Sequence, residues 1–129
     1  MENSTSNILV VEDNRAMCRV IQVILEKAGH SVTCTYDGES AWHAAQNKTF
    51  DLIITDQQMP RMSGVELCQK LRSEERYQRT PLIILTAKGL ELDLVKLKNE
   101  LGVEQVFAKP FSPAKVSEVV EQYLSQPTT

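Results

Sequence analysis

Short apolar runs alternate with amphipathic segments along most of the chain. Three of the runs are apolar at nearly every position, which is typical of strands that are covered on both faces. The run with Val32 and Cys34 alternates with polar residues instead and is predicted to be an edge strand. The predicted strands are Ile8–Val11, Ser31–Thr35, Leu52–Thr55, Leu82–Thr86 and Gln105–Ala108.

Helical periodicity fills the gaps between these strands, with apolar residues three or four positions apart. Asp37 and Ser112-Pro113 are start signals for the second and fifth helices. Gly29 and Gly102 are stop signals for the first and fourth. The apolar stripes of the predicted helices are Met17/Ile21/Ile24/Ala28, Ala41/Trp42/Ala45, Val65/Leu67/Cys68/Leu71, Leu90/Leu94/Leu97/Leu101 and Val116/Val119/Val120/Tyr123.

Repeated alternation of strand and helix predicts an α/β fold with a doubly wound, five-stranded parallel sheet and five helices. The flavodoxin-like strand order 2-1-3-4-5 is the natural one for such units. The domain is expected to span 7–125, with flexible polar ends at 1–6 and 126–129.

The composition argues against several classes of function. The 129 residues have room for one domain, and a formal net charge of −3 disfavours direct nucleic-acid binding through phosphate neutralisation. No apolar run approaches the roughly 18 residues of a membrane span, and the N-terminus lacks the pattern of a signal peptide. The three cysteines form no CxxC motif, which disfavours structural zinc or disulfides and favours a reduced, cytoplasmic location.

Polar side chains stand at the ends of four predicted strands, where open parallel sheets bind their ligands. They are Glu12 and Asp13, then Asp56, Thr86 and Lys109. Three clustered carboxylates would raise one another's pKa values unless a cation such as Mg²⁺ lay among them. A metal, an ammonium and a hydroxyl are what a transferring phosphoryl group needs, and one carboxylate can then act as the nucleophile. Alternatively, Glu12-Asp13 could merely cap the first helix, or Asp13 could both cap it and take part in the site.

These residues lie in motifs that resemble the response-regulator receiver domain, the phosphoacceptor module of two-component signalling. The resemblance covers about 8–124. Its motifs, in order, are ILVVEDN with Glu12-Asp13, LIITDQQMPRMSG with Asp56, PLIILTA with Thr86-Ala87, and FAKPF with Lys109-Pro110. The resemblance implies a phosphorylation-dependent switch, not a classical enzyme, that assists only its own phosphotransfer and autodephosphorylation.

The resemblance also implies roles around the acceptor. Asp56 would accept a phosphoryl group from a phosphohistidine on a histidine kinase or histidine phosphotransfer protein. Mg²⁺ would be bound by Asp13, Asp56 and the backbone carbonyl of Gln58, with Glu12 acting mainly through water. The side chains of Gln58 and Lys88 could reach over the phosphoryl group, where they would either shield it from water or orient the attacking water; shielding is the expected role.

The same resemblance implies roles for the residues that follow the fourth and fifth strands. Thr86 and the backbone of Ala87 would hold phosphoryl oxygens, and Lys109 would pair with Asp56 and then with the phosphoryl group. A cis peptide bond is expected between Lys109 and Pro110. Movement of Thr86 would reshape the face of the fourth helix, fifth strand and fifth helix, to which an output protein or detached output domain responds.

Two features of that face depart from the family or leave alternatives open. Receiver domains often carry an aromatic residue three places before the lysine, where this chain has Val106; Phe107, one place later, is expected in the core. Leu92 and Val95 lie opposite the apolar stripe of the fourth helix. Either the helix starts late and Leu92 packs in the loop, or both form a patch for a partner or a weak homodimer.

Three other functions are alternatives to the switch. An aspartyl-nucleophile phosphatase would place a second acid two residues after the nucleophile, where this chain has Gln58. A flavodoxin-like cofactor binder would need a phosphate loop rich in hydroxyls and glycine in place of Glu12-Asp13-Asn14. A phosphorylation-independent interaction module of the same fold stays open, and only an assay separates it from the switch.

Overall fold

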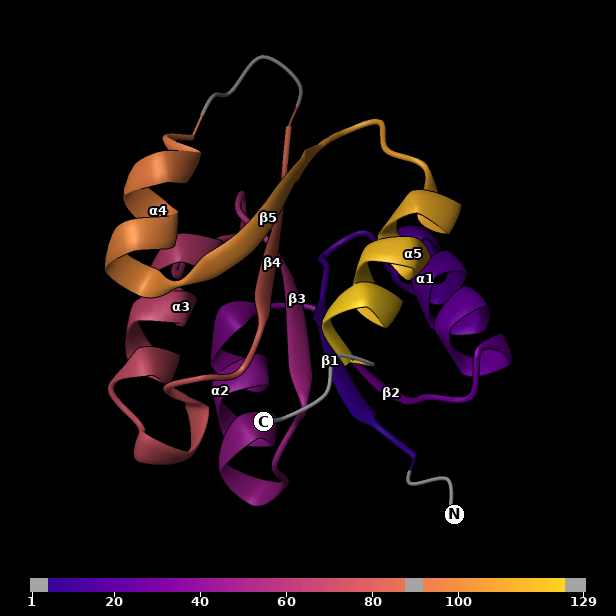
Figure 1. Cartoon of the computed structure of the whole chain (residues 1–129), viewed down its shortest axis with the longest axis horizontal. Coiled ribbons are helices and arrows are strands. Elements are labelled where there is room, and N and C mark those ends of the chain that lie inside the picture. The colour runs from indigo at the N-terminus through magenta and orange to yellow at the C-terminus, as the bar shows by residue number, and fades with distance from the viewer. Residues whose placement is uncertain (1–4, 88–91, 125–129) are drawn as a thin grey trace.

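The computed structural model describes residues 5–87 and 92–124 and confirms the predicted architecture. The parallel strands form one sheet in the order β2-β1-β3-β4-β5, with helices on both faces (Figure 1). Lys88, Leu90 and most of the predicted flexible ends lie outside the described residues. The strands are β1 (Asn7–Val11), β2 (Ser31–Thr35), β3 (Leu52–Asp56), β4 (Leu82–Thr86) and β5 (Val103–Ala108). The helices are α1 (Arg15–Lys27), α2 (Gly38–Asn47), α3 (Gly64–Arg72), α4 (Leu94–Leu101) and α5 (Pro113–Leu124), with a 3₁₀ turn at Glu75–Tyr77.

None of the helices within the described ranges combines the length and the apolar character needed to cross a membrane.

Side-chain caps fix where the helices begin. Asp37 accepts a hydrogen bond of 2.8 Å from a backbone N–H in the first turn of α2, as predicted. At α1 the cap is Asn14, whose Oδ1 accepts from the Met17 N–H at 3.0 Å. The alternative that Asp13 caps α1 is therefore wrong, because the helix begins one residue too late for it.

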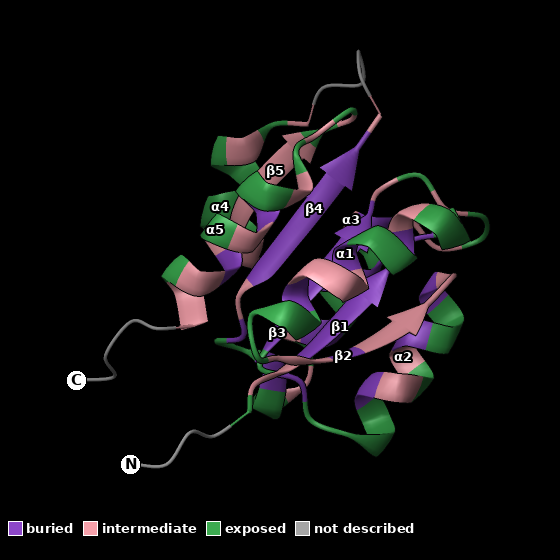
Figure 2. Ribbon diagram, turned by 90° about the vertical axis from the view of Figure 1, so that its right-hand side faces the viewer, coloured by how far each residue is buried: buried purple, intermediate pink, exposed green. Residues whose placement is uncertain are grey.

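The sheet separates two apolar clusters. Strands β1, β3 and β4 are buried at almost every position, whereas the edge strands β2 and β5 are mostly half-buried (Figure 2). One cluster lies beneath α2, α3 and α4, and the other beneath α1 and α5. The alternation of side chains along β1 shows the division, since Leu9 and Val11 belong to the first cluster and Ile8 and Val10 to the second.

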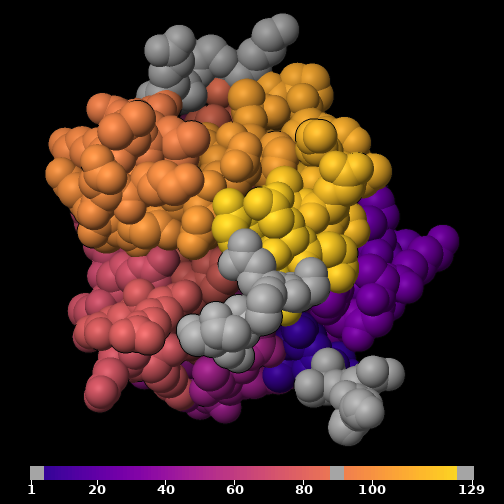
Figure 3. Space-filling view, viewed as in Figure 1, coloured from indigo at the N-terminus to yellow at the C-terminus, as the bar shows by residue number. Residues whose placement is uncertain are grey.

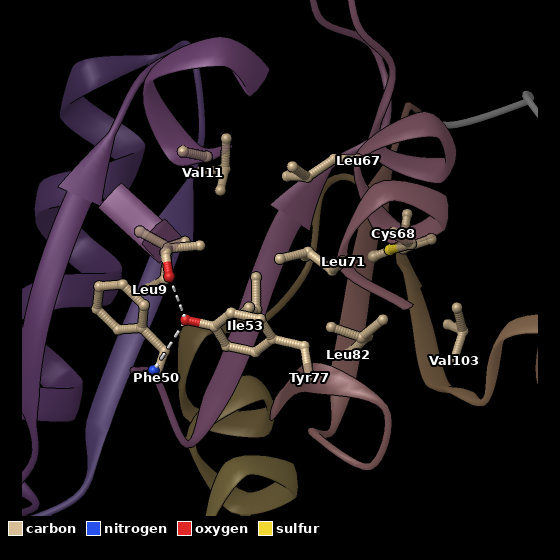
Figure 4. Packing of buried hydrophobic residues seen from close by; sticks show 13 residues of the cluster. Leu9, Val11, Phe50, Ile53, Leu67, Cys68, Leu71, Tyr77, Leu82 and Val103 are labelled. Atoms are coloured by element: carbon tan, nitrogen blue, oxygen red, sulfur yellow. Dashed lines mark hydrogen bonds between the residues drawn. The ribbon is translucent and has the colours of Figure 1, made fainter. Parts of the chain in front are cut away.

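Tyr77 belongs to the cluster beneath α2, α3 and α4 and lies at the amino-terminal edge of the sheet. The side chain is fully buried. Its hydroxyl donates to the Ala45 carbonyl at 2.8 Å and accepts from the Phe50 N–H at 3.3 Å (Figure 4). Because its polar atom is satisfied, this large ring can fill the core and tie the 3₁₀ turn to the α2–β3 connection.

Strand β5 begins earlier than predicted and contains an irregularity. The register with β4 skips Glu104, because consecutive β4 residues lie opposite Val103 and Gln105. The extra residue breaks the period of two, so Val103 and Val106 both join the cluster on the α4 side. Phe107 packs in the cluster on the opposite face, as expected for a core residue.

The fourth helix starts late, which decides between the two alternatives for Leu92. Asp93 caps α4, and Leu92 packs against the core just before it. Val95 is 70% exposed on the helix surface. Within the described residues, α4 is the one α-helix without a fully buried residue.

Candidate functional site

Four strands bring the predicted polar residues to one edge of the sheet. Glu12 directly follows β1, Asp56 ends β3, Thr86 ends β4 and Lys109 directly follows β5. Glu12, Asp56 and Thr86 are at most 3% exposed, although all three are polar. The site is thus assembled by the parallel register of the sheet.

Three carboxylates form the negative part of this site. Oxygens of Glu12, Asp13 and Asp56 lie within 4.8 Å of one another, with Asp13 on the exposed side. Glu12 Oε2 accepts a hydrogen bond of 3.0 Å from the Asn14 N–H. Glu12 Oε1 and Asp56 Oδ1 are buried, and each lies within ion-pair distance of the Lys109 ammonium. Buried acceptor oxygens in a carboxylate cluster fit a hard divalent cation such as Mg²⁺.

Lys109 supplies the positive charge. Its ammonium nitrogen lies 3.0 Å from Glu12 Oε1 and 3.1 Å from Asp56 Oδ1, as ion pairs. The backbone N–H of Lys109 donates to the Thr86 carbonyl at 2.7 Å, and the bond to Pro110 is cis, as predicted. Burial acts to lower the pKa of Lys109, but hydrogen bonds with the two carboxylates raise it above its ordinary value. The side chain therefore stays cationic beside the two buried acidic side chains.

Asp56 is the carboxylate most affected by this environment. Burial raises its pKa from 3.8 to about 7, the negative charge of Glu12 acts in the same direction, and Lys109 opposes both. Without a metal, a large part of Asp56 would be protonated near neutral pH. A bound divalent cation would favour the ionised form that a nucleophile requires.

The loop after Asp56 approaches the start of α3 closely. The Gly64 N–H donates to the Gln57 carbonyl at 3.1 Å. A Cβ at position 64 would lie 2.4 Å from the Asp56 carbonyl oxygen and 3.0 Å from Gln57 Cα. Only glycine fits there, because both neighbouring atoms belong to the backbone.

The side chain of Gln58 crosses from this loop to the end of β4. Its Nε2 donates to Thr86 Oγ1 at 3.2 Å, and its Oε1 accepts from the Ala87 N–H at 2.8 Å. Sequence analysis singled out Gln58 for its carbonyl and for shielding, but missed this bridge. No sequence signal predicts it, because it depends on the path of the loop.

A family comparison agrees with this geometry. The response regulator receiver domain matches residues 8–121. The chain belongs to this family. It is 38% identical over 117 residues to the alkaline phosphatase synthesis transcriptional regulatory protein PhoP of Bacillus subtilis, covering 91% of this chain and 48% of PhoP. It is 34% identical over 119 residues to a chemotaxis protein CheY homolog of Campylobacter jejuni, covering 91% of both chains.

Solved receiver domains share the fold. CheY4 of Vibrio cholerae superposes with a TM-score of 0.83 at 27% identity, over 93% of this chain and 99% of CheY4. The receiver domain of the sensor histidine kinase PA1611 of Pseudomonas aeruginosa has a TM-score of 0.81 and 30% identity, over 95% of this chain and 100% of that one. That structure contains a magnesium ion in its active site cleft.

The relatives differ in length around a common receiver domain. The chain spans about half the length of PhoP and of the B. subtilis regulator YclJ, but 91% of the CheY homolog. Receiver domains are regulators and not classical enzymes. The family therefore places the carboxylate edge in a signalling protein.

Proposed function

We propose that this receiver domain is a switch in which Asp56 accepts a phosphoryl group. The observation that carries the proposal is the convergence of buried Asp56 with Glu12, Asp13 and Lys109 at one sheet edge. In the transfer, an Asp56 carboxylate oxygen bonds to phosphorus as the phosphorus–nitrogen bond of a phosphohistidine breaks. The leaving imidazole takes a proton from solvent, and the product on Asp56 is an acyl phosphate.

The carboxylate side of the site would hold Mg²⁺. Asp13, Asp56 and the Gln58 carbonyl are the proposed ligands, and Glu12 would act mainly through water. When bound, the ion neutralises charge on the carboxylates and on the phosphoryl oxygens.

The β4–β5 side of the site would receive the phosphoryl oxygens. Lys109 already contacts Asp56 at 3.1 Å and would pair with the phosphoryl group after transfer. The Thr86 hydroxyl and the Ala87 N–H stand at the end of β4, where they would donate hydrogen bonds to phosphoryl oxygens. These contacts would stabilise charge in the transition state and in the product.

The proposed response occurs on the face formed by α4, β5 and α5, which make one continuous surface (Figure 3). Phosphorylation adds close to two negative charges beside Thr86 and Lys109, at the ends of β4 and β5. Helix α4 is the least buried helix on this face. A small change in free energy would therefore be enough to shift the equilibrium between alternative positions of the helix. Val95 would lie where an output protein, a detached output domain or a second copy docks.

The proposed donors are a histidine kinase or a histidine phosphotransfer protein. Cys18, Cys34 and Cys68 are all free thiols, which suits the reducing cytoplasm as the place of action. A weak homodimer through the α4 face belongs to the same proposal. An apparent mass that stays monomeric on phosphorylation at high protein concentration would exclude that dimer.

Intact-mass measurement tests the switch directly. The parent protein and Asp56→Asn are incubated with a small acyl phosphate and Mg²⁺, and then with phosphorylated kinases. One phosphoryl group on the parent and none on Asp56→Asn is the expected result. Failure of the parent with every donor would favour the phosphorylation-independent interaction module.

A further inference from the structure

The side-chain amide of Gln58 occupies hydrogen-bonding groups that the phosphoryl group would need. We propose that Gln58 is a built-in competitor, whose amide oxygen holds the Ala87 N–H until a phosphoryl oxygen displaces it. The proposal rests on the proposed function of Asp56. It assigns the Gln58 side chain a positioning role in the unphosphorylated protein.

The hydrogen bond from the Ala87 N–H to Gln58 excludes a phosphoryl oxygen from the same N–H. Gln58 Oε1 lies 2.8 Å from the Ala87 nitrogen, which is a normal hydrogen-bond distance. A backbone N–H has one proton and makes one strong hydrogen bond at a time. A phosphoryl oxygen can therefore bind this N–H only after the amide oxygen has left.

The contact with Thr86 is compatible with phosphorylation. Gln58 Nε2 donates to Thr86 Oγ1 at 3.2 Å, so the hydroxyl acts as an acceptor in this bond. A hydroxyl can accept one hydrogen bond and donate another. The contact with Thr86 can thus persist and keep the displaced amide beside the site.

The position of Gln58 allows the displacement. The residue is exposed and lies in the loop between β3 and α3, so its amide can turn into water. It makes no contribution to either apolar cluster. Its effect should therefore appear in phosphoryl binding more than in folding.

The test uses beryllium fluoride, which binds a carboxylate as an unhydrolysable mimic of the phosphoryl group. Gln58→Met keeps the length and bulk of the side chain but removes both hydrogen bonds. Gln69→Met, at an exposed position of α3, is the matched control. Dissociation constants are measured by titration in saturating Mg²⁺, and the Mg²⁺ affinity is measured separately without beryllium.

Gln58→Met is expected to bind beryllium fluoride about three- to tenfold more tightly than the parent, the range for one lost competing hydrogen bond. Gln69→Met should match the parent, and Mg²⁺ affinity should be the same in all three, since the proposed Gln58 ligand is a backbone carbonyl. In the ligand-free protein, the Ala87 amide proton resonance should move towards weaker hydrogen bonding only in Gln58→Met.

Two results would overturn the competitor role while leaving the switch intact. One is equal or weaker beryllium fluoride binding by Gln58→Met. The other is an equal change in the affinity for Mg²⁺ alone, which would place the effect in the metal site. If neither the parent nor Gln58→Met binds beryllium fluoride, the proposed function fails, and the competitor role fails with it.

Discussion

The Lys109 ammonium nitrogen lies 3.1 Å from Asp56 Oδ1 and joins the ends of two strands that are not neighbours in the sheet. The same nitrogen contacts Glu12, whose side chain is fully buried. Removing one partner of such a cluster leaves buried negative charge without compensation, which is more costly than losing a surface ion pair.

Lys109→Met is therefore expected to destabilise the metal-free protein at pH 8 by roughly 2 to 4 kcal/mol. Urea unfolding in the presence of a chelator measures the change. Lys115→Met is the control, because Lys115 lies on the exposed surface of α5 and pairs only at 3.5 Å with Glu118. Equal stability of Lys109→Met and the parent would show that the ion pairs contribute nothing net.

Because the pKa of Asp56 is raised, the stability of the folded protein should depend on pH. Its pKa is about 7 in the folded protein against 3.8 ordinarily, so the ionised form opposes folding above pH 7. The cost falls as the pH drops through 7, because the folded protein binds the proton more tightly than the unfolded chain. In the metal-free protein, Asp56→Asn should raise Tm by roughly 3 °C or more at pH 8.

That gain should shrink steadily between pH 7 and pH 4. Mg²⁺ should raise the Tm of the parent more than that of Asp56→Asn. Its binding to the parent should weaken as the pH falls below 7, because the ion competes with a proton for Asp56. Thermal scans from pH 4.5 to 8 check both trends, and a gain independent of pH would contradict the assigned titration.

Much of this site was predictable because it follows from the topology of the whole sheet and not from the path of a single loop. Glu12, Asp56, Thr86 and Lys109 stand at strand ends, and a parallel sheet brings all strand ends of one polarity to one edge. The two-sided burial of β1, β3 and β4 followed from runs that are apolar throughout. The strand order followed from the flavodoxin-like arrangement that is natural for five strand–helix units. Neither inference required the path of any loop.

What the sequence did not reveal depends on local backbone geometry. The Gln58 bridge forms because a loop brings one amide within reach of β4. The start of β5 is not recognisable from the sequence, because the register skips Glu104. Val103 and Val106 therefore face the same side of the sheet although they are an odd number of residues apart. Asn14 and Asp13 are equally good capping residues, and only the first turn of α1 decides between them.

Arg72 fastens the carboxyl end of α4 to α3. Its Nε donates to the Leu101 carbonyl at 2.6 Å and one Nη to the Gly102 carbonyl at 3.2 Å, and its other Nη reaches the Tyr77 carbonyl. Arg72→Ala removes all three donors and is expected to cost about 2 to 3 kcal/mol. Arg79→Ala, at an exposed position nearby, should be nearly neutral.

The Arg72 substitution also tests how α4 is held. Hydrogen exchange of the α4 amides should accelerate in Arg72→Ala beyond the change in the central strands, because the last carbonyls of the helix lose their donors. Uniform acceleration across the sheet would indicate a purely global effect and contradict a local role at α4.

Glycine is required at positions 64 and 29 for different reasons, lack of space at the first and backbone conformation at the second. An alanine Cβ at position 64 would meet the Asp56 carbonyl oxygen at 2.4 Å, whereas one at position 29 would meet nothing within 4 Å. Gly29 instead has φ +102°, which strains an alanine by about 1 to 2 kcal/mol. Gly64→Ala is expected to cost more than about 3 kcal/mol, because two backbone segments must separate.

The two variants should also differ at the site. Gly64→Ala pushes on the peptide that carries Asp56, so Mg²⁺ binding should weaken even where the protein is still folded. Gly29→Ala lies at the opposite end of α1 and should bind Mg²⁺ like the parent. Urea unfolding and Mg²⁺ titration of both variants, at a temperature where each is folded, measure the two effects. Equal losses of stability with unchanged Mg²⁺ affinity would mean that the loop after Asp56 yields without moving the carboxylate.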